Sequence, residues 1–119
     1  MALMVVKKVE LKEPQVVKVG PFLYSIFFDK EKLKQATLDH GSSVSGYCRK
    51  DKLEIIIDPD LDIQVKRETL WHEIKHACFA WVAISIDSPT EEQIVCLTAP
   101  LELSVLRENK DLVEYLTVA

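Results

Sequence analysis

The pattern His72-Glu73-Ile74-Lys75-His76 is the stretch of this sequence best suited to chemistry. On an α-helix, residues four positions apart lie one turn apart on the same face. His72 and His76 can therefore direct ring nitrogens at one Zn²⁺ ion. Glu73 lies near the same site, where it can take a proton from a water molecule whose pKa the metal lowers. The pattern predicts a zinc site with His72 and His76 as ligands and Glu73 as general base.

A helix over residues 69–82 must position these side chains. At 100° per residue, one narrow face carries the apolar stripe Leu70, Ile74, Ala77 and Trp81. His72 and His76 fall roughly opposite this stripe, and the second half of the helix is apolar nearly all round. We therefore expect a helix buried on most sides, where unpaired polar groups are costly. A bound metal would satisfy these polar side chains. In the alternative interpretation, they are ordinary polar residues on a solvated helix face.

A catalytic zinc usually has three protein ligands and one open position. The run Ser88-Pro89-Thr90-Glu91 predicts a helix start, with Ser88 as N-cap and Glu91 at N3 of a capping box. The Glu91 carboxylate would then turn back towards the helix start and leave Glu92 free to face the metal. Glu92 is thus the candidate third ligand, although its position is equally typical of a first-turn glutamate favoured by the helix dipole. Glu91 and His40 stay open as alternatives.

Strand patterns precede the motif, over residues 4–11, 16–19, 22–28, 42–50 and 52–58. Gly20-Pro21 predicts the turn between the second and third strands, and Arg49-Lys50-Asp51 predicts the turn of a hairpin formed by the last two. The intervening residues 29–40 are polar and rich in lysine. They predict a short helix that Asp29 caps and Gly41 ends.

Helix patterns dominate the second half of the chain. Asp60 or Asp62 can cap the motif helix, and Pro100 should kink or interrupt the helix that follows it. Asn109 can cap a short last helix over residues 111–116. Strands followed by helices predict an α+β fold, with the helices on one face of a small, mostly antiparallel sheet.

Length and composition limit the range of functions. A chain of 119 residues with 48% apolar content predicts one soluble globular domain spanning residues 1–119. Its net charge of −4 argues against nucleic acid as the main partner. The sequence contains no apolar run of membrane-spanning length and no signal-peptide pattern at its start. Three cysteines without a pairing motif indicate free, buried thiols in a reducing cytoplasm.

The motif helix followed by Glu92 resembles a small gluzincin-type metallopeptidase. More narrowly, it resembles the ImmA/IrrE-like family and the related minigluzincins, many of which phages and prophages encode. Leu70 and Trp71 before the motif, and the hairpin with Gly46-Tyr47 and Leu53 to Ile57, fit the same pattern. The resemblance covers roughly residues 42 to 107.

This resemblance implies a zincin-like fold, the zinc ligands His72, His76 and Glu92, and peptide-bond hydrolysis with Glu73 as general base. The expected partner is a protein or peptide substrate, with no membrane and no nucleic acid. Cys96 stands where relatives often carry Asn. No Tyr or His matches an oxyanion-stabilising position, for which Tyr47 and His40 stay open. The alternatives are a non-catalytic, zinc-stabilised interaction module and a metal-free domain with ordinary polar histidines.

Overall fold

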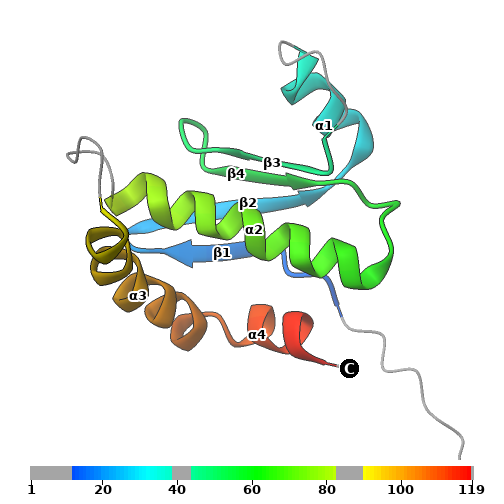
Figure 1. Ribbon diagram of the computed structural model, residues 1–119. Coiled ribbons are helices and arrows are strands. Elements are labelled where there is room, and N and C mark those ends of the chain that lie inside the picture. Colours follow the sequence, from blue (N-terminus) through cyan, green and yellow to red (C-terminus); the bar gives the residue numbers. More distant parts are fainter. Residues whose placement is uncertain (1–11, 39–43, 83–89, 119) are drawn as a thin grey trace, which may run out of the picture.

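The computed structural model describes residues 12–38, 44–82 and 90–118 of the chain. Its centre is a four-stranded sheet in the order β1-β2-β4-β3 (Figure 1). The strands are β1 (Val16–Val19), β2 (Phe22–Phe28), β3 (Gly46–Arg49) and β4 (Glu54–Ile57). The β1–β2 and β3–β4 pairs are antiparallel. The predicted α+β class and mostly antiparallel sheet are therefore confirmed.

One pair of strands, β2 and β4, is parallel, which the sequence did not predict. The chain reverses direction after β2 and again within the β3–β4 hairpin. These two reversals bring β4 back beside β2 in the same direction. The hairpin therefore inserts its second strand into the middle of the sheet and leaves β3 at an edge.

The two predicted hairpins are confirmed. Gly20 adopts a positive φ of 58° in the turn between β1 and β2, a conformation that glycine adopts without steric cost. In the second hairpin Arg49 belongs to β3, so the connection begins one residue later than expected. The strand predicted over residues 4–11 lies outside the described residues.

Helix α1 (Lys30–Ala36) begins where the sequence predicts. The side chain of Asp29 accepts a hydrogen bond from Lys32 N at 3.0 Å. The predicted end at Gly41 is wrong, because the helix already stops at the C-cap residue Thr37. The Thr37 hydroxyl donates to Leu33 O at 2.7 Å and so satisfies one carbonyl of the last turn.

Helix α2 (Ile63–Val82) crosses one face of the sheet and carries the motif (Figure 1). It begins after Asp62, whose carboxylate accepts from Gln64 N at 3.0 Å. As predicted, the residues of its sheet-facing stripe are fully buried: Leu70, Ile74 and Ala77. Trp81 at the end of this stripe is 40% exposed, so its predicted burial is wrong.

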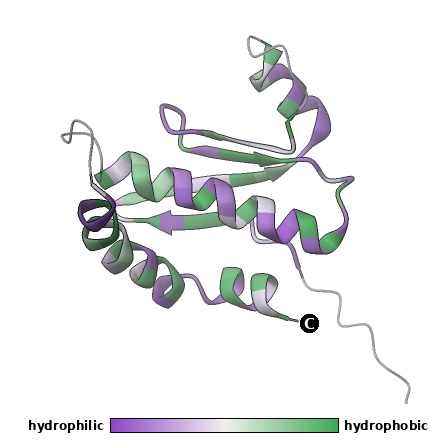
Figure 2. Cartoon of the chain, in the orientation of Figure 1, coloured by the Kyte–Doolittle hydropathy of each residue, from purple (hydrophilic) through white to green (hydrophobic). Residues whose placement is uncertain are grey.

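The expectation that α2 is buried on most sides is also wrong. Phe79 is 40% exposed, and both His72 and His76 are exposed. The physical reason is that α2 packs on the sheet with a single face, and within the described part of the chain its opposite face is exposed. Polar and apolar residues accordingly alternate along this helix in Figure 2.

Helix α3 (Glu91–Glu108) starts with a different cap from the one expected. Thr90 is the N-cap, and its hydroxyl accepts from Gln93 N at 3.2 Å. The Gln93 side chain accepts from Thr90 N at 2.9 Å, which completes a capping box. The predicted box between Ser88 and Glu91 is therefore wrong, and Ser88 lies outside the described residues.

Pro100 and Asn109 are the two positions predicted to interrupt or cap the last helices. Pro100 does not interrupt α3. Asn109 precedes α4 (Lys110–Thr117), but its side chain makes no cap hydrogen bond. Instead, Asn109 accepts from Lys18 N at 2.9 Å and donates to Lys18 O at 3.0 Å. This pair of bonds ties the junction of the last two helices to β1.

The main core lies between the sheet and the helices α2, α3 and α4. It contains Val17, Val19, Tyr24, Ile26, Ile55, Ile57, Leu70, Ile74, Ala77, Cys78, Val105, Leu112 and Tyr115. Helix α1 packs elsewhere, with Lys32 Nζ 4.3 Å from the centre of the Phe27 ring. The helices therefore do not all share one face as predicted. Within the described segments no helix is long and apolar enough to cross a membrane.

Candidate metal centre

The two motif histidines point at each other on the open face of α2. His72 Nε2 and His76 Nε2 lie 3.1 Å apart. A tetrahedral zinc ion bound at 2.0–2.1 Å from each nitrogen would hold them about 3.3 Å apart. The observed spacing therefore suits two nitrogens that converge on one metal ion.

Glu73 completes a group of three residues that can hold a metal. One ligand atom from each of His72, Glu73 and His76 lies within 4.8 Å of the others. Unlike the histidines, Glu73 is buried, with 5% of its surface exposed. Burial raises the pKa of its carboxyl, while the nearby His76 and His72 act in the opposite direction. A carboxyl with a raised pKa beside a metal site is suited to accept and release a proton.

Gly46 on the edge strand β3 allows α2 to approach this closely. A Cβ atom at Gly46 would lie 2.8 Å from Thr69 Cγ2 and 3.1 Å from Glu73 Cγ. The Glu73 side chain is thus held between the helix and the backbone of β3. The sequence pattern had marked Gly46 only as part of the hairpin.

Replacing Gly46 with alanine should displace Thr69 and Glu73. Overpacking of this kind costs about 1–3 kcal/mol. We expect the G46A variant to lose that amount of unfolding free energy in urea denaturation and to bind zinc more weakly than the wild type. The neighbouring, exposed Ser45 provides the matched control. Equal stability of G46A and S45A would contradict this account of the close contact.

A cleft lies between β3 and α2 on both sides of Glu73. The larger cavity measures about 620 Å³ and contains Glu73 and His76 in its lining, together with Tyr47, Cys48, Arg49, Lys50, Asp51, Phe79 and Ala80. The smaller measures about 400 Å³ and is lined by Val44, Ser45, Gly46, Val65, Glu68, Thr69, His72 and Glu73. The metal-binding group is therefore open to molecules that lie along the edge strand.

The backbone of β3 can bind such a molecule. Asp58 N donates to Ser45 O at 2.9 Å, which makes this a hydrogen-bonded pair of the antiparallel ladder. Because bonded and non-bonded pairs alternate, the N–H and C=O groups of Gly46 and Cys48 point away from β4. These groups face the open side of the edge strand, beside the metal-binding group.

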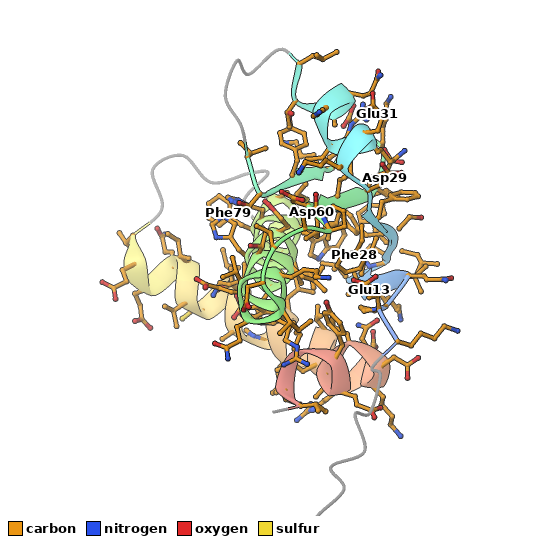
Figure 3. All side chains as sticks on the ribbon, turned by 90° about the vertical axis from the view of Figure 1, so that its right-hand side faces the viewer. Glu13, Phe28, Asp29, Glu31, Asp60 and Phe79 are labelled. Atoms are coloured by element: carbon orange, nitrogen blue, oxygen red, sulfur yellow. The ribbon has the colours of Figure 1, made fainter. Side chains whose placement is uncertain are left out.

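Glu92, the predicted third ligand, is not part of the group around the histidines. It lies in the first turn of α3, is exposed, and accepts a hydrogen bond from Cys96 Sγ at 3.3 Å. The residues from Glu91 to Ala99 include no fully buried side chain, and in Figure 3 the first turns of α3 extend away from the sheet. The later part of α3 lies against α2, where Lys75 Nζ and Glu102 Oε1 are 3.2 Å apart.

The cap of α3 removes the expected difference between Glu92 and Glu91. Because Thr90 and Gln93 form the capping box, Glu91 has no role in it, and both glutamates are exposed first-turn residues. His40 lies outside the described residues, whereas Tyr47 lines the larger cavity with Glu73 and His76. The third ligand therefore stays a prediction.

The cysteines are free, but they occupy three different environments. Cys78 is buried in the core, Cys48 is half-buried in the larger cavity, and Cys96 is exposed. The prediction that the thiols are buried is therefore confirmed for Cys78 and wrong for the half-buried Cys48 and the exposed Cys96. Burial, with the nearby Glu73 charge as a second cause, raises the pKa of the Cys48 thiol to about 12. This thiol is neutral at physiological pH and does not offer a thiolate in the absence of metal.

Glu68 is a cavity residue that the sequence reading missed. It lies one turn before His72 on α2 and lines the smaller cavity with His72 and Glu73. Its spacing of four residues from His72 was the available signal.

No family model matches the chain, and comparisons with curated proteins and with solved structures gave no match. The resemblance to gluzincin-type peptidases therefore rests on the motif and its surroundings. The geometry shows a group of residues able to hold a metal ion.

Proposed function

We propose that this protein is a zinc-dependent metallopeptidase that hydrolyses a peptide bond in a protein or peptide substrate. The observation that carries the proposal is the 3.1 Å approach of His72 Nε2 to His76 Nε2 beside the buried Glu73. A cleft along an edge strand gives this group access to an extended chain. The motif resemblance to ImmA/IrrE-like and minigluzincin peptidases, many of them from phages, supports the same activity.

Each residue of the group has a distinct task. When bound, zinc supplies Lewis acidity to the scissile carbonyl and to the attacking water. His72 and His76 would hold the ion through their Nε2 atoms. Glu73 accepts a proton from the water and delivers it to the leaving amine nitrogen. Burial raises the pKa of its carboxyl, which favours uptake of the proton from the water.

The substrate would bind as an added strand on β3. Extended peptides pair with exposed sheet edges through main-chain hydrogen bonds. The outward-facing backbone groups of Gly46 and Cys48 offer those bonds. The larger cavity, with Tyr47 and Phe79 in its lining, would accommodate side chains on one side of the scissile bond.

Glu92 is our candidate for the third ligand. For its carboxylate to reach the ion, the first half of α3 must approach the histidines. Pro100 separates this exposed half from the half that contains the buried Val105. Proline removes a helical hydrogen bond and so creates a weak point at which the two halves can change their angle.

Metal analysis tests the proposal. Protein purified without chelators should contain about one zinc per chain by mass spectrometry, a ratio that E92A should lower and E91A should leave unchanged. The wild type should also cleave a mixed peptide library, and a chelator should stop the cleavage. If the protein holds no zinc even after zinc is added back, the proposed peptidase activity is refuted. Zinc retained in E92A but lost in E91A would make Glu91 the ligand.

A second candidate is a zinc-stabilised interaction module without catalysis. It is favoured by large apolar side chains that α2 and α3 leave exposed: Phe79, Trp81, Val95, Leu97, Leu103 and Leu106. Metal binding can supply folding free energy directly. Zinc binding without cleavage of any peptide in the library would favour this alternative.

A further inference from the structure

An aromatic cavity lies where the end of α2 meets the turns of both hairpins (Figure 1). It measures about 390 Å³, within the range of roughly 300–1,000 Å³ that is typical of ligand pockets. Its apolar lining consists of Phe22, Tyr24, Leu53, Ala80 and Trp81. A largely apolar lining suits an apolar ligand group.

Trp81 is held in a defined orientation at this cavity. Its ring meets the ring of Phe22 edge to face, with the ring centres 5.2 Å apart. The indole also lies close to the backbone of Gly20, where a Cβ atom would be 3.0 Å from Trp81 Nε1. Trp81 is nevertheless 40% exposed and Phe22 is 39% exposed, so both rings offer contact area to a ligand.

Leu53 has a strained backbone at the same cavity. Its φ is 53°, a left-handed conformation that is uncommon for residues other than glycine. Leu53 O accepts a hydrogen bond from Ser25 N at 2.9 Å, and the half-buried side chain packs against the main core. Strain of this kind persists where the surrounding structure enforces it, and it clusters at binding sites. A leucine at a position that suits glycine is therefore consistent with a role for its side chain as a wall of the cavity.

The aromatic cavity adjoins the cleft beside the metal-binding group. It shares Lys50, Asp51 and Ala80 with the cavity of about 620 Å³. That cavity in turn shares Glu73 with the cavity of about 400 Å³. The three cavities therefore follow one another along α2, and the metal-binding group lies where the first two meet.

The length of this groove relates the aromatic cavity to a position in the substrate. An α-helix rises by about 1.5 Å per residue, so the step from Glu73 to Ala80 corresponds to about 10 Å along α2. An extended strand advances by about 3.3 Å per residue. A peptide bound along β3 with its scissile bond beside Glu73 would therefore place a residue about three positions from that bond at the aromatic cavity.

We propose that the aromatic cavity is a specificity subsite for a large apolar side chain, preferably an aromatic one, about three residues from the scissile bond. The proposal rests on the proposed peptidase function, because it requires a peptide along β3. Edge-to-face and offset packing against Trp81 and Phe22 adds to the attraction that area burial provides. The two charged residues of the lining, Lys50 and Asp51, have opposite signs, so the cavity does not favour a charged side chain of either sign.

Cleavage of a position-scanned peptide library is the first test. Hydrophobic pockets distinguish side chains that differ by one methylene by about 10–200-fold. We expect kcat/KM to be at least about 10-fold higher for phenylalanine than for alanine at this position, and W81A should bring the two values close together. Leu103 on α3 is another exposed apolar residue and lines none of the three cavities, so L103A should keep the preference. An unchanged preference in W81A, or no such preference in the wild type, would overturn the proposal.

A binding measurement on the metal-free wild type does not depend on cleavage or on the folding of a variant. The probe is N-acetylphenylalaninamide, and N-acetylglycinamide is its matched control. Trp71 and Trp81 are the two tryptophans of the chain, so each gives one indole N–H signal by NMR. We expect the phenylalanine probe to shift the Trp81 signal more than the glycine probe does, and to leave Trp71, which lines none of the three cavities, unchanged.

The two experiments separate the subsite from the proposed function. A selective shift of Trp81 without cleavage of any peptide would refute the peptidase but support the aromatic cavity as a binding site for apolar side chains. Cleavage with equal shifts from both probes, or with a shift confined to Trp71, would support the peptidase and refute the subsite.

Discussion

Replacing Glu73 with glutamine should lower peptide cleavage by about 10²–10⁴-fold, the range that general acid–base catalysis contributes. Glutamine has nearly the same shape but cannot accept the proton of the attacking water. The histidine nitrogens that hold the metal are unchanged, so E73Q should keep about one zinc per chain. Cleavage of a fluorogenic peptide and metal analysis, performed on the same preparation, give the two readouts.

The control for this variant is K75Q. Lys75 lies inside the motif but pairs with Glu102 on α3, with 54% of its side chain exposed. Exposed ion pairs contribute little to stability, so K75Q should cleave at a rate close to the wild type. Cleavage by E73Q at the wild-type rate would exclude Glu73 as the base. Loss of zinc in E73Q would instead mean that Glu73 belongs to the ligand set.

Local signals predicted much of the fold because they report on neighbours along the chain. Alternating strand residues, the Gly20-Pro21 turn and the caps at Asp29 and Asp62 each act over a few residues, and the structure confirms them. The parallel pairing of β2 with β4 joins segments separated by α1 and β3. No local pattern encodes such a pairing, because it depends on where the hairpin docks.

The grouping of His72, Glu73 and His76 was predicted correctly, but the burial on which that prediction relied is wrong for the two histidines. Periodicity suggested an α2 buried on most sides, in which the histidines would need a metal to offset their burial. In the structure Glu73 is buried, while His72 and His76 face a cleft. Apolar residues such as Phe79 on the outer face of α2 were expected to belong to the core. The sequence alone does not show which face of a helix is covered, and among the described residues this face is exposed.

The start of α3 shows how one cap can change the assignment of a site. Ser88 and Thr90 are both good N-cap residues, and each is followed three positions later by a suitable partner, Glu91 or Gln93. The structure selects Thr90, which moves the helix start by two residues. Glu91 then loses the role that had distinguished it from Glu92. Metal analysis of E91A and E92A must therefore decide which of the two glutamates binds the metal.

Replacing His76 with alanine should abolish zinc binding. The ion loses one of its two nitrogen ligands, so the affinity should fall by more than the 10–100-fold that is typical of an outer-shell partner. Zinc at 100 times its Kd stabilises a folded protein by about 2.7 kcal/mol. Thermal unfolding with and without zinc should show that gain in the wild type and none in H76A.

His40 supplies the matched control, because it is the one histidine of the chain outside the motif. H40A should retain zinc and its stabilisation, and loss of zinc in H40A would make His40 a ligand. His76 is exposed, and exposed substitutions usually change stability by less than about 0.5 kcal/mol. The metal-free form of H76A should therefore unfold at nearly the wild-type temperature. A large loss of stability without metal would mean that His76 supports the fold and that its loss of zinc is a secondary effect.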